Sequence, residues 1–94
     1  MDINTPGNAQ DSLIEYPCEF PIKVMGASHP DFASTMLDVV RQHDPAIDAS
    51  KVVSRDSAKG NYLSLTITVH ATSRAQLDAI YIALSSHPMV KMAL

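Results

Sequence analysis

A run of alternating side chains between Tyr62 and Ala71 constrains the fold of this chain more than any other feature. Successive side chains of a strand point to opposite faces of a sheet, so a repeat of two predicts a half-buried strand. A helix is disfavoured, because its apolar stripe would have to include Thr66 and His70. The apolar positions are Leu63, Leu65, Ile67, Val69 and Ala71, and the alternate positions are Tyr62, Ser64, Thr66, Thr68 and His70.

The length and composition of the chain are those of one small globular domain. It has 94 residues, 46% of them hydrophobic, and no internal repeat. No apolar run approaches the ~18 residues that a membrane helix needs, so we expect a soluble protein without a membrane segment. Residues 1–12 are rich in Asn, Gly, Asp and Ser and are expected to form a disordered tail. Residues 13–94 would then form the single domain.

The N-terminal sequence, the cysteine content and the net charge limit which compartment and which partners are expected. No basic segment followed by an apolar one opens the sequence, so the cytoplasm is the expected compartment. The single Cys18 agrees, since one thiol forms no internal disulfide. A net charge of −3 argues against general nucleic-acid binding, which usually needs a basic surface.

The first half of the chain predicts a strand followed by a helix. Pro17 and Pro21 lack the N–H that a central strand donates, so the first strand is expected from about Ile22 to Gly26. Ser28 or His29 is the expected helix cap, with Pro30 at the first helical position. The helix should end near His43, because Asp44 precedes Pro45.

The second half predicts two strands, a helix and a last strand. Residues 52–57 form the next strand, and a turn over residues 57–61, with Gly60 at positive φ, leads into the long alternating strand. Ser73 and Gln76 match a capping box, which opens a helix that Pro88 closes. Residues 89–94 alternate again and are expected to be the fourth strand.

The element order β-α-β-β-α-β predicts an α+β ferredoxin-like two-layer sandwich. Two right-handed crossovers then give a four-stranded antiparallel sheet in the order 4-1-3-2, with both helices on one face. The other face is open to solvent, as in many antiparallel sheets. It should carry Lys23, Met25, Tyr62, Ser64, Thr66, Thr68, His70, Lys91 and Ala93.

This open side is the predicted interaction face. Lysines on adjacent strands beside hydroxyl groups could hold an anionic ligand or an acidic patch of a protein partner. A merely solvated face is the competing interpretation. The residues assigned to the interaction face, including those of the adjoining turn, are Lys23, Lys59, Asn61, Tyr62, His70 and Lys91.

Three kinds of chemistry fit this sequence poorly. RNA-recognition domains share the strand order but stack bases on central aromatic side chains, where this chain has Ser64, Thr66 and Thr68. Acylphosphatases also share it, and Asn61 could serve as their asparagine, but residues 25–29 contain no arginine to stabilise a phosphate. The four histidines and Cys18 have no metal-ligand spacing, so no metal, cofactor or catalytic residue is predicted.

The loop from Gly26 to Asp31 is the candidate small-molecule site. The start of a helix offers free N–H groups and a partial positive charge, so a carboxylate or phosphate could bind there. An ordinary capped helix is the competing interpretation of the same residues.

Four separated segments resemble the YbeD-like family of small bacterial proteins of unknown function. They are Leu13-Ile14-Glu15-Tyr16-Pro17, then Phe20 with Lys23-Val24-Met25-Gly26, then Lys59-Gly60-Asn61-Tyr62 with Ser64 and Ile67-Thr68, and Val90-Lys91-Met92 with Leu94. The resemblance implies a ferredoxin-like sandwich similar to ACT regulatory domains and suggests a role beside lipoate metabolism. It implies no catalytic residues. An ACT-like ligand would lie at a dimer interface beside Met25, Gly26, Ala27, Ser28 and His29.

Two functional hypotheses follow. The leading one is a non-enzymatic regulatory or protein-interaction module with a protein partner of unknown identity. The alternative is an ACT-like sensor of an amino acid or another small carboxylate, acting as a homodimer.

Overall fold

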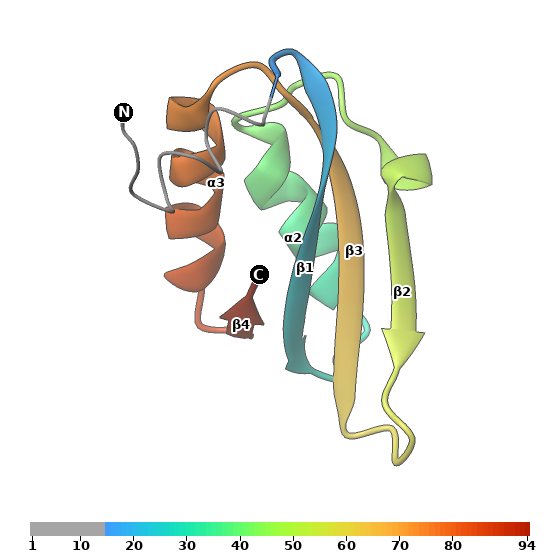
Figure 1. The fold of residues 1–94 in the computed structure, drawn as a ribbon. Helices are drawn as coiled ribbons and strands as arrows, with labels where there is room; N and C mark the ends of the chain where they lie inside the picture. Colours follow the sequence, from blue (N-terminus) through green and yellow to red (C-terminus); the bar gives the residue numbers. More distant parts are fainter. Residues whose placement is uncertain (1–14) are drawn as a thin grey trace, which may run out of the picture.

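The computed structural model describes residues 15–94 as one mixed sheet-and-helix unit. The tail predicted over residues 1–12 lies outside the described residues. The elements in chain order are β1 (Cys18–Ala27), α2 (Phe32–Arg41), the 3-10 turn η1 (Ala49–Lys51), β2 (Val52–Asp56), β3 (Tyr62–Ala71), α3 (Arg74–Ser85) and β4 (Val90–Ala93) (Figure 1).

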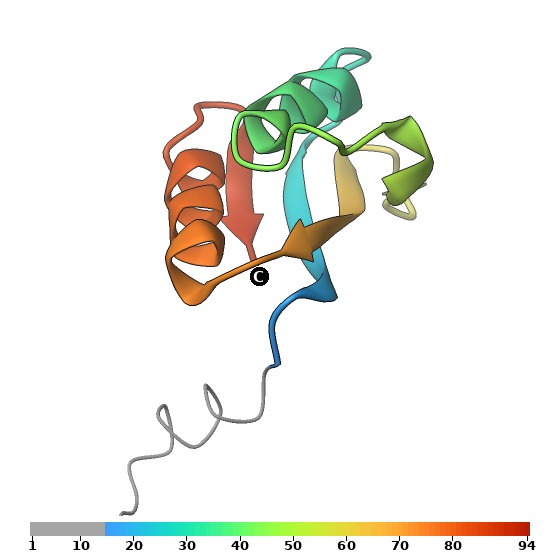
Figure 2. The same cartoon turned by 90° about the horizontal axis from the view of Figure 1, so that it is seen from above.

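The sheet has the order β2-β3-β1-β4, and every neighbouring pair of strands is antiparallel. Figure 2, which looks from above, shows α2 and α3 beside each other against this sheet. Order, direction and layering are those of the ferredoxin-like α+β sandwich, so the predicted fold class is confirmed.

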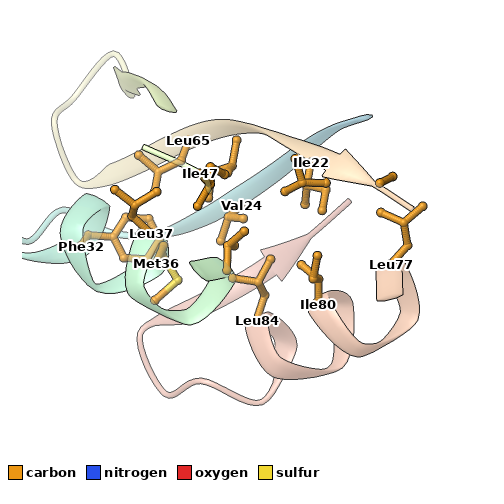
Figure 3. Close-up of a cluster of buried hydrophobic side chains, with 14 residues drawn as sticks. Ile22, Val24, Phe32, Met36, Leu37, Ile47, Leu65, Leu77, Ile80 and Leu84 are labelled. Atoms are coloured by element: carbon orange, nitrogen blue, oxygen red, sulfur yellow. The ribbon is translucent and has the colours of Figure 1, made fainter. Parts of the chain in front are cut away.

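The core lies between the sheet and the two helices and follows the alternation of β3. Leu65, Ile67 and Val69 are fully buried, and Ile22 and Val24 of β1 are buried beside them. Figure 3 shows the helical side chains that close the core from below the sheet. The predicted inward parity of β1 and β3 is therefore confirmed. The buried helical residues are Phe32, Met36, Leu37, Val40, Leu77, Ile80 and Leu84.

β1 is longer than the sequence predicted. It begins at Cys18, not near Ile22, and Pro21 pairs with Thr68 of β3. The N–H of Lys23 donates to the carbonyl of Leu94 at 3.0 Å, and the N–H of Leu94 donates back at 2.7 Å. In a strand, residues two apart direct their backbone N–H and C=O groups to the same side, so those of Pro21 and Lys23 face the same neighbouring strand. At Pro21, however, β4 has already ended. The missing N–H of Pro21 therefore breaks no bond of the sheet.

The parity predicted for β4 is wrong. Met92 lies opposite Met25, and Ala93 lies opposite the buried Val24. The register shifts between Met25 and Gly26, so that Lys91 is an extra residue in β4. Such a shift moves the following side chains to the other face of a sheet. Met92 consequently occupies the open face, and Ala93 lies on the helix side.

The start of α2 differs from the predicted one. α2 begins at Phe32 and its N-cap residue is Asp31, which makes no side-chain capping hydrogen bond. Neither Ser28 nor His29 is therefore the cap, and Pro30 precedes the helix and is not its first residue. The Nδ1 atom of His29 accepts the N–H of Asp31 at 3.0 Å, and the carbonyl of His29 accepts the N–H of Phe32 at 3.0 Å. The N–H groups of the N-cap residue Asp31 and of Phe32 thus both find an acceptor on His29.

At the start of α3, only one of the two hydrogen bonds of the predicted capping box is present. The Ser73 hydroxyl accepts the N–H of Gln76 at 3.1 Å. The Gln76 side chain does not return to Ser73, because its oxygen accepts the N–H of Thr72 at 2.6 Å. Its Nε2 atom donates to the carbonyls of His43 and His70 at 2.9 and 3.2 Å. Gln76 therefore joins α3 to the end of β3 and to the loop after α2.

Candidate functional site

The candidate functional site is the face of the sheet that carries no helix, called the open face below. The strand pairings arrange its side chains in rows across the sheet. One row is Met92, Met25, Ser64 and Arg55, and the next is Leu94, Lys23, Thr66 and Val53. Tyr62 and Ala27 form the row at the end where β3 begins.

Exposed apolar side chains gather on this face. Four of the five large hydrophobic side chains that are exposed within residues 15–94 belong to it, and the fifth, Ile82, lies on α3. Apolar side chains that are grouped on one surface mark interaction sites more often than scattered ones do. The four side chains, with their exposed fractions, are Val53 (62%), Tyr62 (51%), Met92 (48%) and Leu94 (61%).

Two basic side chains of the open face have no carboxylate partner within residues 15–94. Three of the seven Lys and Arg residues do have one, in the pairs Arg41–Asp38 at 3.0 Å, Lys51–Glu19 at 3.4 Å and Arg74–Asp78 at 3.0 Å. Lys23 and Arg55 make no ion pair with any described residue and lie on the open face between the exposed apolar groups. Their charges are therefore available to an acidic partner.

His70 lies on the open face as predicted, but its ring is held by a neighbour that the sequence did not indicate. Glu19 lies directly opposite His70 on β1, and its Oε2 atom is 2.9 Å from Nδ1 of His70. The ring N–H of His70 donates to this carboxylate and lowers the pKa of Glu19, and Lys51 lowers it further. The sequence missed Glu19 because the strand was expected to begin after Pro21.

We predict a small, pH-dependent contribution of Glu19 to stability. A carboxyl whose pKa is lower when folded stabilises the protein above its ordinary pKa of 4.5, and the contribution is lost as the pH falls through the lowered value. Wild type should therefore melt slightly higher than Glu19→Gln at pH 7, and the difference should vanish at acid pH. Melting curves by circular dichroism across this range test the prediction. A difference that grew toward acid pH would contradict it.

The turn residues of the predicted interaction face lie at the end of the sheet and not on its open side. Gly60 adopts a φ of +72°, as the sequence predicted. Asn61 uses its carbonyl to accept the N–H of Ser28 at 3.2 Å, which joins this turn to the loop before α2. Lys59 is exposed in the same turn.

Lys91 lies apart from Lys23, in a hollow of about 470 Å³ that we call the loop pocket. Of the predicted ligand-binding residues, Ala27 and His29 line this pocket, whereas Met25 belongs to the open face and Gly26 is buried. Because Nδ1 of His29 accepts a hydrogen bond, a neutral His29 carries its proton on Nε2. The full lining is Ala27, His29, Pro88, Met89, Val90 and Lys91.

Two further features of residues 15–94 bear on the kind of site. No three His, Cys, Asp or Glu side chains of this part of the chain are grouped as metal ligands would be. Within the same residues, neither helix is long and apolar enough to cross a membrane.

These observations define the class of the protein: a ferredoxin-like α/β sandwich with an exposed, partly apolar sheet face. The solution structure of protein HP0495 from H. pylori has the same fold, with a TM-score of 0.71 over 99% of this chain and 98% of that one. The two sequences are 15% identical, so this likeness concerns the fold alone.

The chain belongs to the family described as "Protein of unknown function (DUF493)", whose model matches residues 11–94. A UPF0250 protein of Paraburkholderia phytofirmans is 60% identical over 87 residues, which cover 93% of this chain and 98% of the relative. A UPF0250 protein of Chromobacterium violaceum is 51% identical over 85 residues, covering 90% and 96%. The resemblance to YbeD-like small bacterial proteins is thereby confirmed.

Proposed function

We propose that this chain is a non-enzymatic protein-interaction module of the cytoplasm, which binds an acidic protein partner through its open face. The observation that supports the proposal is the grouping of Val53, Tyr62, Met92 and Leu94 around Lys23 and Arg55, which make no ion pair with any described residue. Protein interfaces commonly combine apolar and aromatic anchors with arginine. A regulatory role beside lipoate metabolism is part of this proposal and rests on the YbeD-like resemblance alone.

A capture experiment with matched charge reversals tests the proposal. The bait is the full chain as wild type, as Lys23→Glu/Arg55→Glu, and as Lys91→Glu, and captured proteins from native cell extract are quantified by mass spectrometry. Lys91→Glu is the control, because Lys91 has no cross-strand partner in β1, lines the loop pocket and makes no ion pair with any of residues 15–94. We expect a partner that wild type and Lys91→Glu retain and that the double variant loses at least about tenfold, as 1.4 kcal/mol of binding would give. Equal capture by all three baits would refute the proposal.

A second candidate function is the sensing of a small carboxylate in the loop pocket. Its volume of about 470 Å³ falls within the range of roughly 300–1,000 Å³ that is typical of ligand sites. The Lys91 ammonium and the Nε2–H of a neutral His29 could both bind a carboxylate. These residues support the ACT-like candidate in a different form from the predicted one, because the pocket includes Ala27 and His29 and adds Lys91 but is not lined by Met25, Gly26 or Ser28.

A thermal-shift screen tests this second candidate. A ligand that binds only the folded state raises its stability by RT ln(1 + [L]/Kd). Amino acids, lipoate and organic phosphates are added to wild type, Lys91→Ala and Arg55→Ala. Sensing predicts a rise in melting temperature that Lys91→Ala abolishes and Arg55→Ala retains. Unchanged melting with every compound would eliminate this candidate.

A further inference from the structure

The open face contains a small apolar hollow, called the face pocket below, at the end where β3 begins. Its volume is about 170 Å³, and almost all of its exposed lining is apolar. An engineered protein cavity of about 150 Å³ holds benzene, so the face pocket has the size for one aliphatic or aromatic side chain. Its lining residues are Met25, Arg55, Asp56, Ser57, Tyr62, Leu63 and Ser64.

The guanidinium group at this pocket is free to bind a carboxylate. The Arg55 side chain makes no hydrogen bond or ion pair with any of residues 15–94, and Asp56 beside it is not within ion-pair distance. Arg55 and Ser64 are paired across β2 and β3, and Met25 lies opposite Ser64 on β1. A planar guanidinium binds a carboxylate through two parallel hydrogen bonds, and arginine is enriched at interfaces.

The distribution of charge along the molecule favours an acidic partner at this end. Arg55, Lys59 and Lys91 lie where β2 ends, in the following turn and where β4 begins, which is the same end of the sheet in Figure 1. Two carboxylates, those of Asp31 and Asp56, lie at this same end of the sheet. The other described carboxylates lie on segments nearer the opposite end, namely Glu15, Glu19, Asp38, Asp44, Asp48 and Asp78. A chain of net charge −3 thus presents a locally basic end.

We infer that the face pocket receives one aliphatic or aromatic side chain of a protein partner, and that Arg55 binds a carboxylate next to that side chain in the partner sequence. This inference rests on the proposed function and specifies the recognised motif. The pocket supplies the apolar anchor, Arg55 supplies the charge, and Lys23, one row away on β1, adds long-range attraction.

Selection from a peptide library tests the inference. A phage-displayed library of random dodecamers is panned against the folded full chain, and affinities of the selected peptides are measured by fluorescence anisotropy. We expect enrichment of peptides in which Asp or Glu adjoins Leu, Phe or Trp. Their binding should weaken at least tenfold with Arg55→Glu, with Ser64→Trp, which fills the pocket, and when the peptide acid is replaced by its amide. Arg41→Glu, which reverses a charge in the last turn of α2 and away from this end of the sheet, should bind within twofold of wild type.

The inference falls if the selected peptides lack carboxylates, if Arg55→Glu binds them as tightly as wild type, or if no peptide is enriched. Circular dichroism of each variant separates lost binding from lost folding. If capture of a protein from extract still requires Lys23 and Arg55 together, the proposed function stands although the motif is wrong. If neither the selected peptides nor a captured protein depends on these basic residues, the proposed function is refuted as well.

Discussion

Replacing Gly26 by alanine should destabilise the domain by roughly 3 kcal/mol, the upper part of the range for overpacking a core. A Cβ atom on Gly26 would meet the carbonyl oxygen of Met89 at 2.2 Å and the ring of Phe32 at 2.7 Å. The first of these neighbours is backbone, so β4 or the loop before it would have to shift. Denaturant unfolding followed by circular dichroism measures the loss, since the chain has no tryptophan.

Gly60→Ala is the matched control for this change. Gly60 has a φ of +72°, and no atom lies within 4 Å of the position that a Cβ atom would occupy, so only backbone strain opposes the substitution. That strain amounts to about 1–2 kcal/mol for an alanine. Gly60→Asn should recover part of it, because asparagine tolerates the left-handed conformation. A Gly26→Ala protein as stable as the Gly60→Ala protein would show that β1, Phe32 and Met89 are not packed as described.

Ile67→Ala should cost about 2–5 kcal/mol, whereas Thr66→Ala, its neighbour, should cost less than about 1 kcal/mol. Ile67 is fully buried at the centre of β3, between Ile22 and Val52 on the flanking strands. Thr66 points to the open face, between Lys23 and Val53. Unfolding midpoints of the two variants test the orientation of the sheet. Similar losses at both positions would contradict it.

The part of the fold that the sequence predicted correctly is the part in which one side chain pattern dominates. The alternation of β3 fixes which face is buried, because a slip of one residue would expose Leu65 and Ile67 and bury Thr66. The element order then leaves few ways to connect the strands. Ser73 marked the start of α3 through a single local hydrogen bond.

The predictions were wrong where the length or the register of a strand depends on the neighbouring strand. Pro21 was taken to exclude a strand, yet β4 stops before reaching it, and the sequence of β1 alone does not contain that information. The shift beside Gly26 moved Ala93 to the helix side in the same way and left Lys91 without a partner on β1. Glu19 was missed as a site residue because it lay outside the expected strand. Arg55 was missed because the side chains of residues 52–57 do not indicate which face of that strand is buried.

The molecule therefore offers two separate surfaces, and each belongs to a different proposed function. The open face carries apolar side chains with Lys23 and Arg55, whereas the loop pocket carries His29 and Lys91 beside the start of α2. Because Lys91 lines the loop pocket and Lys23 lies on the open face, single variants at these lysines distinguish protein binding from carboxylate binding.

The methionines report on both surfaces in one measurement. Met25 and Met92 lie on the open face, Met36 is buried in the core, and Met89 lines the loop pocket. With methyl-labelled methionine, NMR spectra are recorded while the captured partner, or a selected peptide, is added to the full chain. Binding at the open face should shift the methyl signals of Met25 and Met92 and leave those of Met36 and Met89 in place. Shifts confined to Met89 would contradict the account and move the binding site to the loop pocket.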